Sequence, residues 1–228
     1  MRTYRMEIRL IQVAVGLALI VLIAGFAGFW GQGGKVPGVP TNPNSTATNP
    51  TQKNPKIVAL GDSFTLGYPL DPEHSWTTRT AEVLQIPVIN KGKSRQTSKD
   101  LLNRFDTDVV AEDPGRVVIF AGIGDALQDV PLKEVQTNIK AIVEKAKSNH
   151  IVPILALPVW YPGVRENIKE TREWELGYAQ QEDILTLDFS TVLFDKDGKY
   201  LSGLTIDEKY PNAKGYKAMG DYAAQILK

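Results

Sequence analysis

The sequence predicts an α/β fold, a three-layer α/β/α sandwich around a five-stranded parallel sheet. Between residues 56 and 228, short apolar runs rich in β-branched residues alternate with segments of helical periodicity. Such alternation produces parallel strands that are joined by right-handed crossovers. Several of the runs are apolar throughout, which is expected of strands that helices cover on both faces.

The individual elements follow from these two patterns. The runs that predict strands are Lys56–Gly61, Pro87–Asn90, Arg116–Gly122, Ile151–Leu157 and Ile184–Asp188. The segments that predict helices are Trp76–Leu84, Ser98–Phe105, Pro131–Asn149, Arg165–Gln181 and Asn212–Leu227. Ligand sites in parallel sheets lie at the carboxyl ends of the strands. We therefore expect Ser63, after the first strand, and Asp125, after the third, to lie at such an edge.

The N-terminal part of the chain predicts a membrane anchor and a tether. Residues 1–9 are basic, and residues 10–30 carry no charge. As a helix, residues 10–30 span roughly 31 Å, close to the thickness of the hydrocarbon core. The basic end places residues 1–9 in the cytoplasm and residues 56–228 outside the cell membrane. The alternative is a cleaved signal peptide and a secreted protein, since Gly25–Ala27 is a small-x-small site. Residues 31–55, rich in Gly, Pro, Asn and Thr, predict a flexible linker.

Composition excludes several function classes. The 26 basic residues balance the 26 acidic ones, so we expect no nucleic-acid partner. There is no cysteine, which excludes disulfides and thiolate metal sites. The two histidines, His74 and His150, are not at metal-ligand spacing, so we expect no metal and no cofactor. We expect residues 56–228 to form a monomeric domain.

The most informative stretch is the octet Gly61–Tyr68, which follows the apolar run Ile57–Leu60. A buried strand ends here in a tight turn, and Gly61 allows the backbone to turn sharply. Ser63 then lies at the start of the next helix, with its hydroxyl exposed and its own N–H facing incoming negative charge. The pattern indicates a serine nucleophile.

The octet resembles the first motif block of the SGNH, or GDSL-type, hydrolases, a family of esterases, lipases and acylhydrolases. Val88–Thr97 (VINKGKSRQT), Phe120–Asp125 (FAGIGD) and Asp207–Tyr216 (DEKYPNAKGY) resemble its other blocks. The resemblance covers essentially all of residues 56–228 and implies a flavodoxin-like fold. It also implies ester hydrolysis by a serine, a histidine base and an aspartate that orients the histidine. The implied oxyanion hole uses the serine N–H, the N–H of a second-block glycine and a third-block asparagine.

The chain departs from the family pattern at three positions. Ser63 and Asp207 match the nucleophile and the aspartate, but Arg95 replaces the glycine, Gly124 the asparagine and Tyr210 the histidine. Loss of one oxyanion donor costs about 10²–10³ in kcat. A phenol with a pKa near ~10 is a poor base at neutral pH, and loss of the base costs on the order of 10⁶. The catalytic set therefore predicts an impaired enzyme.

Two residues bear on how the altered site works. We expect the Arg95 guanidinium to pair with Asp62 or Asp207, or to lie across the mouth of the cleft beside Ser63. In that case a histidine at position 210 would not restore activity by itself. His74, in the loop after the nucleophile turn, is the alternative base; otherwise it is an exposed loop histidine.

Three functions remain open at this point. The first is a membrane-anchored, extracytoplasmic member of the family with little hydrolase activity, which binds a small acylated or glycan ligand at the old site. The second is an active carboxylic-ester hydrolase that uses Ser63 with a non-standard base. The third is a structural surface module whose contacts lie elsewhere.

Overall fold

The computed structural model describes residues 54–228. The predicted anchor over residues 10–30, and all but the last two residues of the predicted linker, lie outside these residues. Within residues 54–228, no helix has both the length and the apolar character that a membrane span requires.

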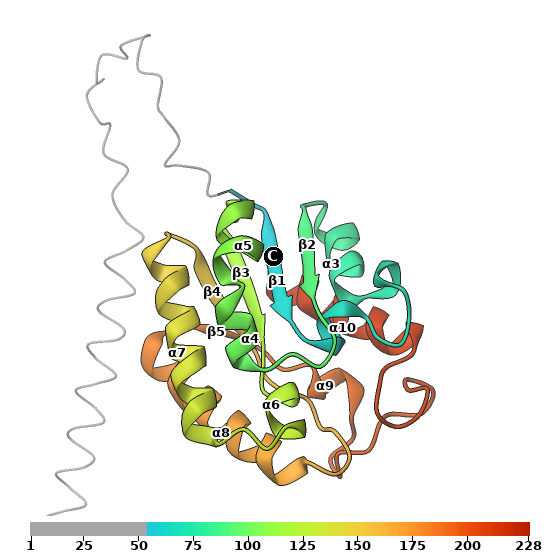
Figure 1. The fold of residues 1–228 in the computed structure, drawn as a ribbon. Helices are drawn as coiled ribbons and strands as arrows, with labels where there is room; N and C mark the ends of the chain where they lie inside the picture. The colour runs from blue at the N-terminus through green and yellow to red at the C-terminus, as the bar shows by residue number, and fades with distance from the viewer. Residues whose placement is uncertain (1–53) are drawn as a thin grey trace, which may run out of the picture. The chain divides into compact units, whose positions relative to one another are not determined.

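The sheet contains five parallel strands in the order β2-β1-β3-β4-β5 (Figure 1). The strands are β1 (Ile57–Gly61), β2 (Val88–Gly92), β3 (Arg116–Phe120), β4 (Val152–Ala156) and β5 (Leu185–Leu187). The register brings the ends of the first three strands together, since Gly61 is paired with both Gly92 and Phe120. The predicted fold class and all five predicted strands are confirmed.

The longer helices also agree with the sequence patterns. They are α3 (Trp76–Leu84), α4 (Ser98–Asn103), α7 (Leu132–Ser148), α8 (Arg165–Glu182) and α10 (Ala213–Ile226). Short helical turns are added at α2 (Ser63–Leu66), η1 (Pro72–His74), α5 (Phe105–Asp108), η2 (Val110–Glu112), α6 (Ile123–Leu127) and α9 (Ser190–Leu193). These turns have too few residues to show a helical period, so sequence periodicity does not detect them.

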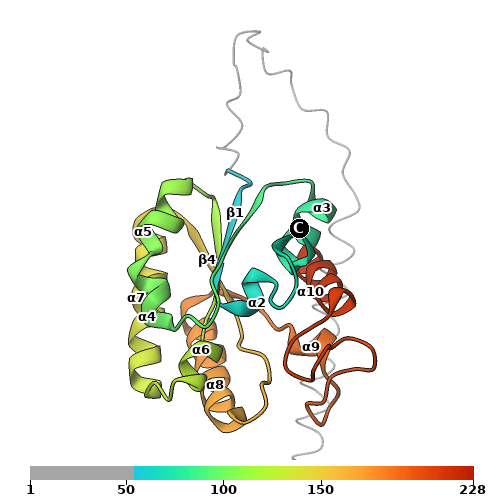
Figure 2. The same ribbon diagram turned by 45° about the vertical axis from the view of Figure 1, so that its right-hand side comes forward.

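Alternate residues of the strands enter two separate cores, because successive side chains point to opposite faces of a sheet. Ile57 and Ala59 of β1 pack in the core that contains residues of α3, α9 and α10. Val58 and Leu60 pack in the core that contains residues of α4, α5, α7 and α8. Figure 2 shows the resulting three layers, with α4, α5 and α7 on one side of the sheet and α3 and α10 on the other.

The strand order fixes the place of the candidate site. β1 and β3 are neighbours in the sheet, although β2 lies between them in sequence. At such a switch point the connections leave the two strands toward opposite faces. Here α2 follows β1 and α6 follows β3, and the two short helices lie on either side of the sheet's end (Figure 2). The predicted positions of Ser63 and Asp125 just beyond β1 and β3 are confirmed.

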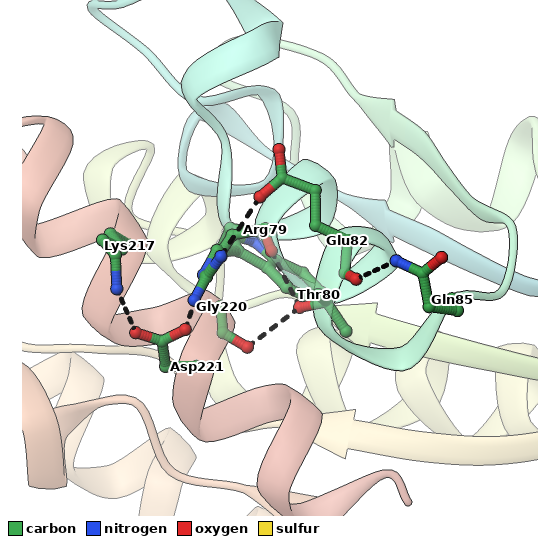
Figure 3. Close-up of polar contacts among 8 residues, drawn as sticks. Arg79, Thr80, Glu82, Gln85, Lys217, Gly220 and Asp221 are labelled. Carbon is green, nitrogen blue, oxygen red and sulfur yellow. Dashed lines mark hydrogen bonds and ion pairs between the residues drawn. The ribbon is translucent and has the colours of Figure 1, made fainter.

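A close contact between α3 and α10 joins the first and last parts of the domain (Figure 3). The Arg79 guanidinium donates to Asp221 at 2.6 Å, and Thr80 Oγ donates to the carbonyl of Gly220 at 3.3 Å. Gly220 permits this approach, because a Cβ there would lie 2.4 Å from the Cβ of Arg79 and 2.8 Å from the carbonyl oxygen of Trp76. α10 is thereby held against α3, which follows α2 and η1 in the chain.

The variant Gly220→Ala should lower the free energy of unfolding by about 1–3 kcal/mol, since the added methyl group overpacks the contact between α3 and α10. The matched control is Gly177→Ala on α8, where a Cβ meets no atom within 4 Å. That control should raise the free energy of unfolding by roughly 0.5–1 kcal/mol through helix propensity. Urea denaturation of both variants measures the difference, and equal stabilities would contradict the packing argument.

Candidate active site

Ser63 is the first residue of α2, directly after β1. Asp62 caps this helix, because its Oδ1 accepts a hydrogen bond from the backbone N–H of Phe64 at 2.9 Å. Gly61 is required before it, since a Cβ there would lie 2.1 Å from the Thr65 hydroxyl oxygen. The predicted turn is confirmed, but the predicted exposure of the serine is not: Ser63 is only 5% exposed.

The other end of α2 is held by two side chains that the sequence patterns did not single out. Ser75 Oγ and Asn90 Nδ2 each donate to the carbonyl oxygen of Thr65 at 2.8 Å. Gly92, at the end of β2, passes so close that a Cβ would lie 2.1 Å from the backbone nitrogen of Leu66. The sequence does show a polar residue, Asn90, and a glycine, Gly92, at the end of an apolar strand. These two residues indicate that the strand end contacts another segment, but they do not identify that segment as α2.

The Ser63 hydroxyl faces the loop that follows β2. Its Oγ accepts a hydrogen bond from the backbone N–H of Arg95 at 3.0 Å and lies 3.1 Å from Ser94 Oγ. Arg95 has a φ of 62°, in the left-handed region that favours glycine. The backbone donor that the family resemblance assigns to a glycine is therefore present, on an arginine in a glycine's conformation.

The side chain of Arg95 does not behave as expected. It is exposed, and none of the ion pairs formed within residues 54–228 includes it. The predicted pairing with Asp62 or Asp207 is therefore wrong, and the alternative, that the side chain lies across the mouth of the cleft beside Ser63, stays a prediction. A guanidinium in contact with water keeps its hydration, whereas pairing inside a cleft would require its desolvation. Within the part of the chain that the structure describes, its hydrogen bonds run through its backbone N–H to Ser63 Oγ and through its carbonyl oxygen, which accepts from Gln128.

Gly124 lies in α6, where the same loop covers it. A Cβ at this position would be 2.0 Å from the carbonyl oxygen of Gln96. The space in which an asparagine side chain would begin is therefore filled by backbone. The oxyanion donor of the family's asparagine is absent, and the present loop leaves no room for it.

Asp125 holds that loop in place. Its carboxylate accepts hydrogen bonds from the Ser98 N–H at 2.9 Å, the Ser98 hydroxyl at 2.7 Å and the Gly122 N–H at 3.2 Å. Asn138 on α7 in turn donates to Ser98 Oγ at 3.1 Å. The start of α4 is thereby fixed to α6 and α7, which positions the preceding residues against Ser63 and Gly124.

Tyr210 lies in a cluster of aromatic rings beside Ser63. Its ring centroid is 4.9 Å from that of Tyr68, 5.3 Å from that of Phe64 and 5.6 Å from that of Tyr161. Burial, followed by the hydrogen bond with Tyr161, raises the pKa of Tyr210, and the nearby Ser63 hydroxyl opposes the rise only in part. The phenol is protonated at neutral pH and cannot accept the serine proton.

The remaining two candidates make no hydrogen bond with Ser63. Asp207 is exposed, and its Oδ1 accepts hydrogen bonds from the backbone N–H groups of Lys209 and Tyr210 at 3.0 and 2.9 Å. His74 is exposed in η1, and within residues 54–228 its imidazole forms no hydrogen bond. The part of the chain that the structure describes also contains no cluster of His, Asp and Glu that could hold a metal ion.

Asp62 is the acidic group beside Ser63 whose ionisation is most affected by the fold. It is 1% exposed, and its Oδ2 has no hydrogen-bond partner within the described residues. Burial raises the pKa of Asp62 to about 7; the backbone N–H of Phe64 opposes this rise, and the charge of Asp125 adds to it. Sequence patterns place Asp62 in the motif but do not report its burial or its unpaired oxygen.

Residues of the β4–α8 loop, of the start of α8 and of the α9–α10 loop line a cleft of about 520 Å³. Tyr161 is part of its wall, and the Tyr161 Oη is 3.4 Å from the Tyr210 Oη. Tyr161 therefore joins the cleft wall to Tyr210, whose ring packs on that of Phe64, the residue after Ser63.

Comparison with known proteins gives a consistent assignment. A family model described as GDSL-like Lipase/Acylhydrolase family matches residues 59–218. A solved structure from Desulfitobacterium hafniense, described under the G-D-S-L family of lipolytic proteins, is 57% identical, with a TM-score of 0.75. The match covers 76% of this chain and 99% of that one. A GDSL-like lipase from Bacteroides thetaiotaomicron is 25% identical, with a TM-score of 0.64, over 78% of this chain and 90% of that one.

Two curated relatives match over shorter segments. The uncharacterized lipoprotein YqeF of Bacillus subtilis is 30% identical over 112 residues, which is 43% of this chain and 46% of YqeF. An arylesterase of Vibrio mimicus is 28% identical over 104 residues, which is 43% of this chain and 52% of the arylesterase. The chain spans about half the length of these curated relatives.

The raised pKa of Asp62 predicts a pH-dependent stability. Its value of about 7 in the folded protein lies above the ordinary 3.8, so the folded state binds a proton that the unfolded chain has lost. This stabilisation is fully present below about pH 4 and is lost as the pH rises through about 7. Burial raises the pKa of Asp125 and Glu175 in the same direction. The free energy of unfolding should therefore fall between about pH 5 and 8.

The variant Asp62→Asn removes the ionisable group but keeps an oxygen that can cap α2, so its stability should fall less steeply over that pH range. The exposed residue Glu73 provides the control Glu73→Gln, which should keep the original slope. Thermal unfolding at a series of pH values measures all three proteins. An unchanged slope in Asp62→Asn would show that this carboxyl ionises as it does in the unfolded chain.

Proposed function

The chain belongs to the GDSL-like lipase/acylhydrolase family, and on that premise we propose that its site binds a small acylated or glycan ligand but hydrolyses esters weakly at most. The observation that carries this proposal is the phenol of Tyr210 in the place of the base. Ser63 needs a group that accepts its proton, and the neighbouring Tyr210 has a pKa that is raised rather than lowered.

The remaining parts of the site favour binding over turnover. The Arg95 N–H lies 3.0 Å from Ser63 Oγ, so a donor for a carbonyl oxygen is retained there. The third donor is missing at Gly124, and the Gln96 carbonyl fills the space for its side chain. Asp207, whose family role is to orient a histidine, instead caps the backbone of its own loop.

We also propose that the domain is held outside the cell membrane by residues 10–30. The support is the length and the lack of charge of this segment, together with the basic residues before it. One curated relative is described as a lipoprotein, although this chain has no cysteine that could carry a lipid.

The first test is hydrolysis of p-nitrophenyl acetate by the full chain and by its Ser63→Ala variant. We expect equal rates, because loss of the general base lowers kcat by a factor on the order of 10⁶ in a serine protease. Without a base, the full chain should have no Ser63-dependent hydrolysis that the substitution could abolish. A clear decrease in Ser63→Ala would overturn the proposal. In that event His74→Ala would identify whether the exposed imidazole serves as the base.

The second test restores the base with Tyr210→His and uses Tyr210→Phe as the matched control. The histidine variant should gain weak, Ser63-dependent turnover, about 10²–10³ below that of a complete site, since one oxyanion donor is still absent. The phenylalanine variant should remain inactive. Adding Arg95→Gly should change little, because the backbone N–H is already in place, whereas Gly124→Asn should destabilise the fold.

Because Arg95 is exposed and forms no ion pair within residues 54–228, we expect the missing donor at Gly124, more than the Arg95 side chain, to limit the histidine variant. Full family-like activity in Tyr210→His would show that the Gly124 donor is dispensable, and no activity at all would show that position 210 cannot place an imidazole against Ser63.

A further inference from the structure

The cleft beside Tyr161 carries more positive than negative charge. Of its lining residues, Arg165 and Lys199 are cationic and Glu208 is anionic. Within residues 54–228, no ion pair includes any of these three. Lys199 and Glu208 are exposed, so their charges can meet a ligand that enters from solvent.

The guanidinium of Arg165 is held in a fixed position at this wall. It lies 5.8 Å from the ring centroid of Trp160, within the range of a cation–π contact. It also donates to the carbonyl oxygens of Asp197 and Gly198. A guanidinium has five N–H donors, so donors remain for an oxyanion of a ligand. A cation that is already positioned loses less entropy when it binds.

The rest of the wall combines aromatic rings with hydroxyl groups. Trp160, Tyr161, Phe194 and Tyr200 contribute rings, and Ser202 and Thr205 contribute hydroxyls. The negative face of an aromatic ring attracts the partly positive C–H groups on the face of a sugar ring. A long acyl chain fits this wall poorly, because it would take water from two cations without replacing their hydrogen bonds.

From this combination we propose that the cleft binds an anionic saccharide, a sugar ring that carries a carboxylate or a phosphate. Arg165 and Lys199 bind the anionic group, and the aromatic rings contact the sugar. The volume of about 520 Å³ is in the range of small-molecule sites. The inference rests on the proposed binding function, since Tyr161 of the cleft wall contacts Tyr210 of the candidate site, with 3.4 Å between their hydroxyl oxygens.

The experiment is calorimetric titration of the full chain with three probes. These are α-1,4-linked digalacturonate, the uncharged α-1,4-linked disaccharide maltose, and galactose 6-phosphate. We expect the two anionic probes to bind and maltose to bind at least about tenfold more weakly, with the difference shrinking at high salt. The tighter of the two anionic probes identifies carboxylate or phosphate as the preferred group. Equal binding of maltose, or binding of no probe, overturns the inference.

Variants locate the binding to this cleft. Lys199→Gln and Arg165→Gln should each weaken binding of the anionic probes by about tenfold. The matched control is Lys196→Gln, an exposed lysine near Lys199 that is not part of the cleft wall, and its affinity should be unchanged. Since Arg165 also contacts backbone, thermal unfolding checks that Arg165→Gln is folded. If Arg165→Gln does not fold, the affinity of Lys199→Gln alone tests the location of the binding site. Equal losses in all three variants would place the binding elsewhere.

The same titration with Ser63→Ala separates this inference from the proposed function. Binding should persist in Ser63→Ala, because the serine is not part of the cleft wall. Ser63-dependent ester hydrolysis would overturn the proposed weak activity and leave the ligand class standing. Failure of the anionic probes to bind would remove the ligand class, while inactivity toward p-nitrophenyl acetate would still support an impaired catalytic set.

Discussion

The site depends on the buried carboxylate of Asp125. By accepting hydrogen bonds from Ser98 and Gly122, it ties the loop after β2 to the helix after β3 across the switch point of the sheet. Two consequences follow from this single attachment. The Arg95 N–H reaches Ser63 Oγ, and the Gln96 carbonyl closes on Gly124. One donor of the oxyanion hole is thus retained by the same constraint that excludes another.

A second constraint is the exclusion of water around Ser63. Ser63 is 5% exposed and the neighbouring Asp62 is 1% exposed, and the ring of Tyr210 packs against those of Phe64 and Tyr68. Both effects act on ionisation in the same sense, because burial disfavours a phenolate and a carboxylate alike. At neutral pH, Tyr210 is therefore protonated and Asp62 is only partly ionised. Since no hydrogen bond joins the Asp62 carboxyl to the Ser63 hydroxyl within residues 54–228, the arrangement suits recognition of a carbonyl or a hydroxyl better than proton transfer.

Sequence reasoning succeeded where a residue's role is local. The apolar runs predicted every strand, and the octet around Ser63 predicted the turn at the end of β1. It failed where the role depends on the path of a distant loop. Arg95 has a left-handed backbone conformation, which determines the direction of its side chain, and no local sequence pattern predicts this conformation. The crowding at Gly124 arises from Gln96, which follows a different strand. Likewise, the polarity of Asn90 was visible in the sequence, but its partner Thr65 was not.

The contact between α3 and α10 has a consequence for how the protein is made. Arg79 and Asp221 are separated by 142 positions, and the loop that carries Tyr210 precedes α10. Synthesis delivers Ser63, the loop after β2 and α6 long before it delivers Tyr210. The packing of Tyr210 on Phe64 therefore joins parts of the chain that are far apart in sequence. Like the contact between α3 and α10, it is a pairing of high contact order, and such pairings are slow to form.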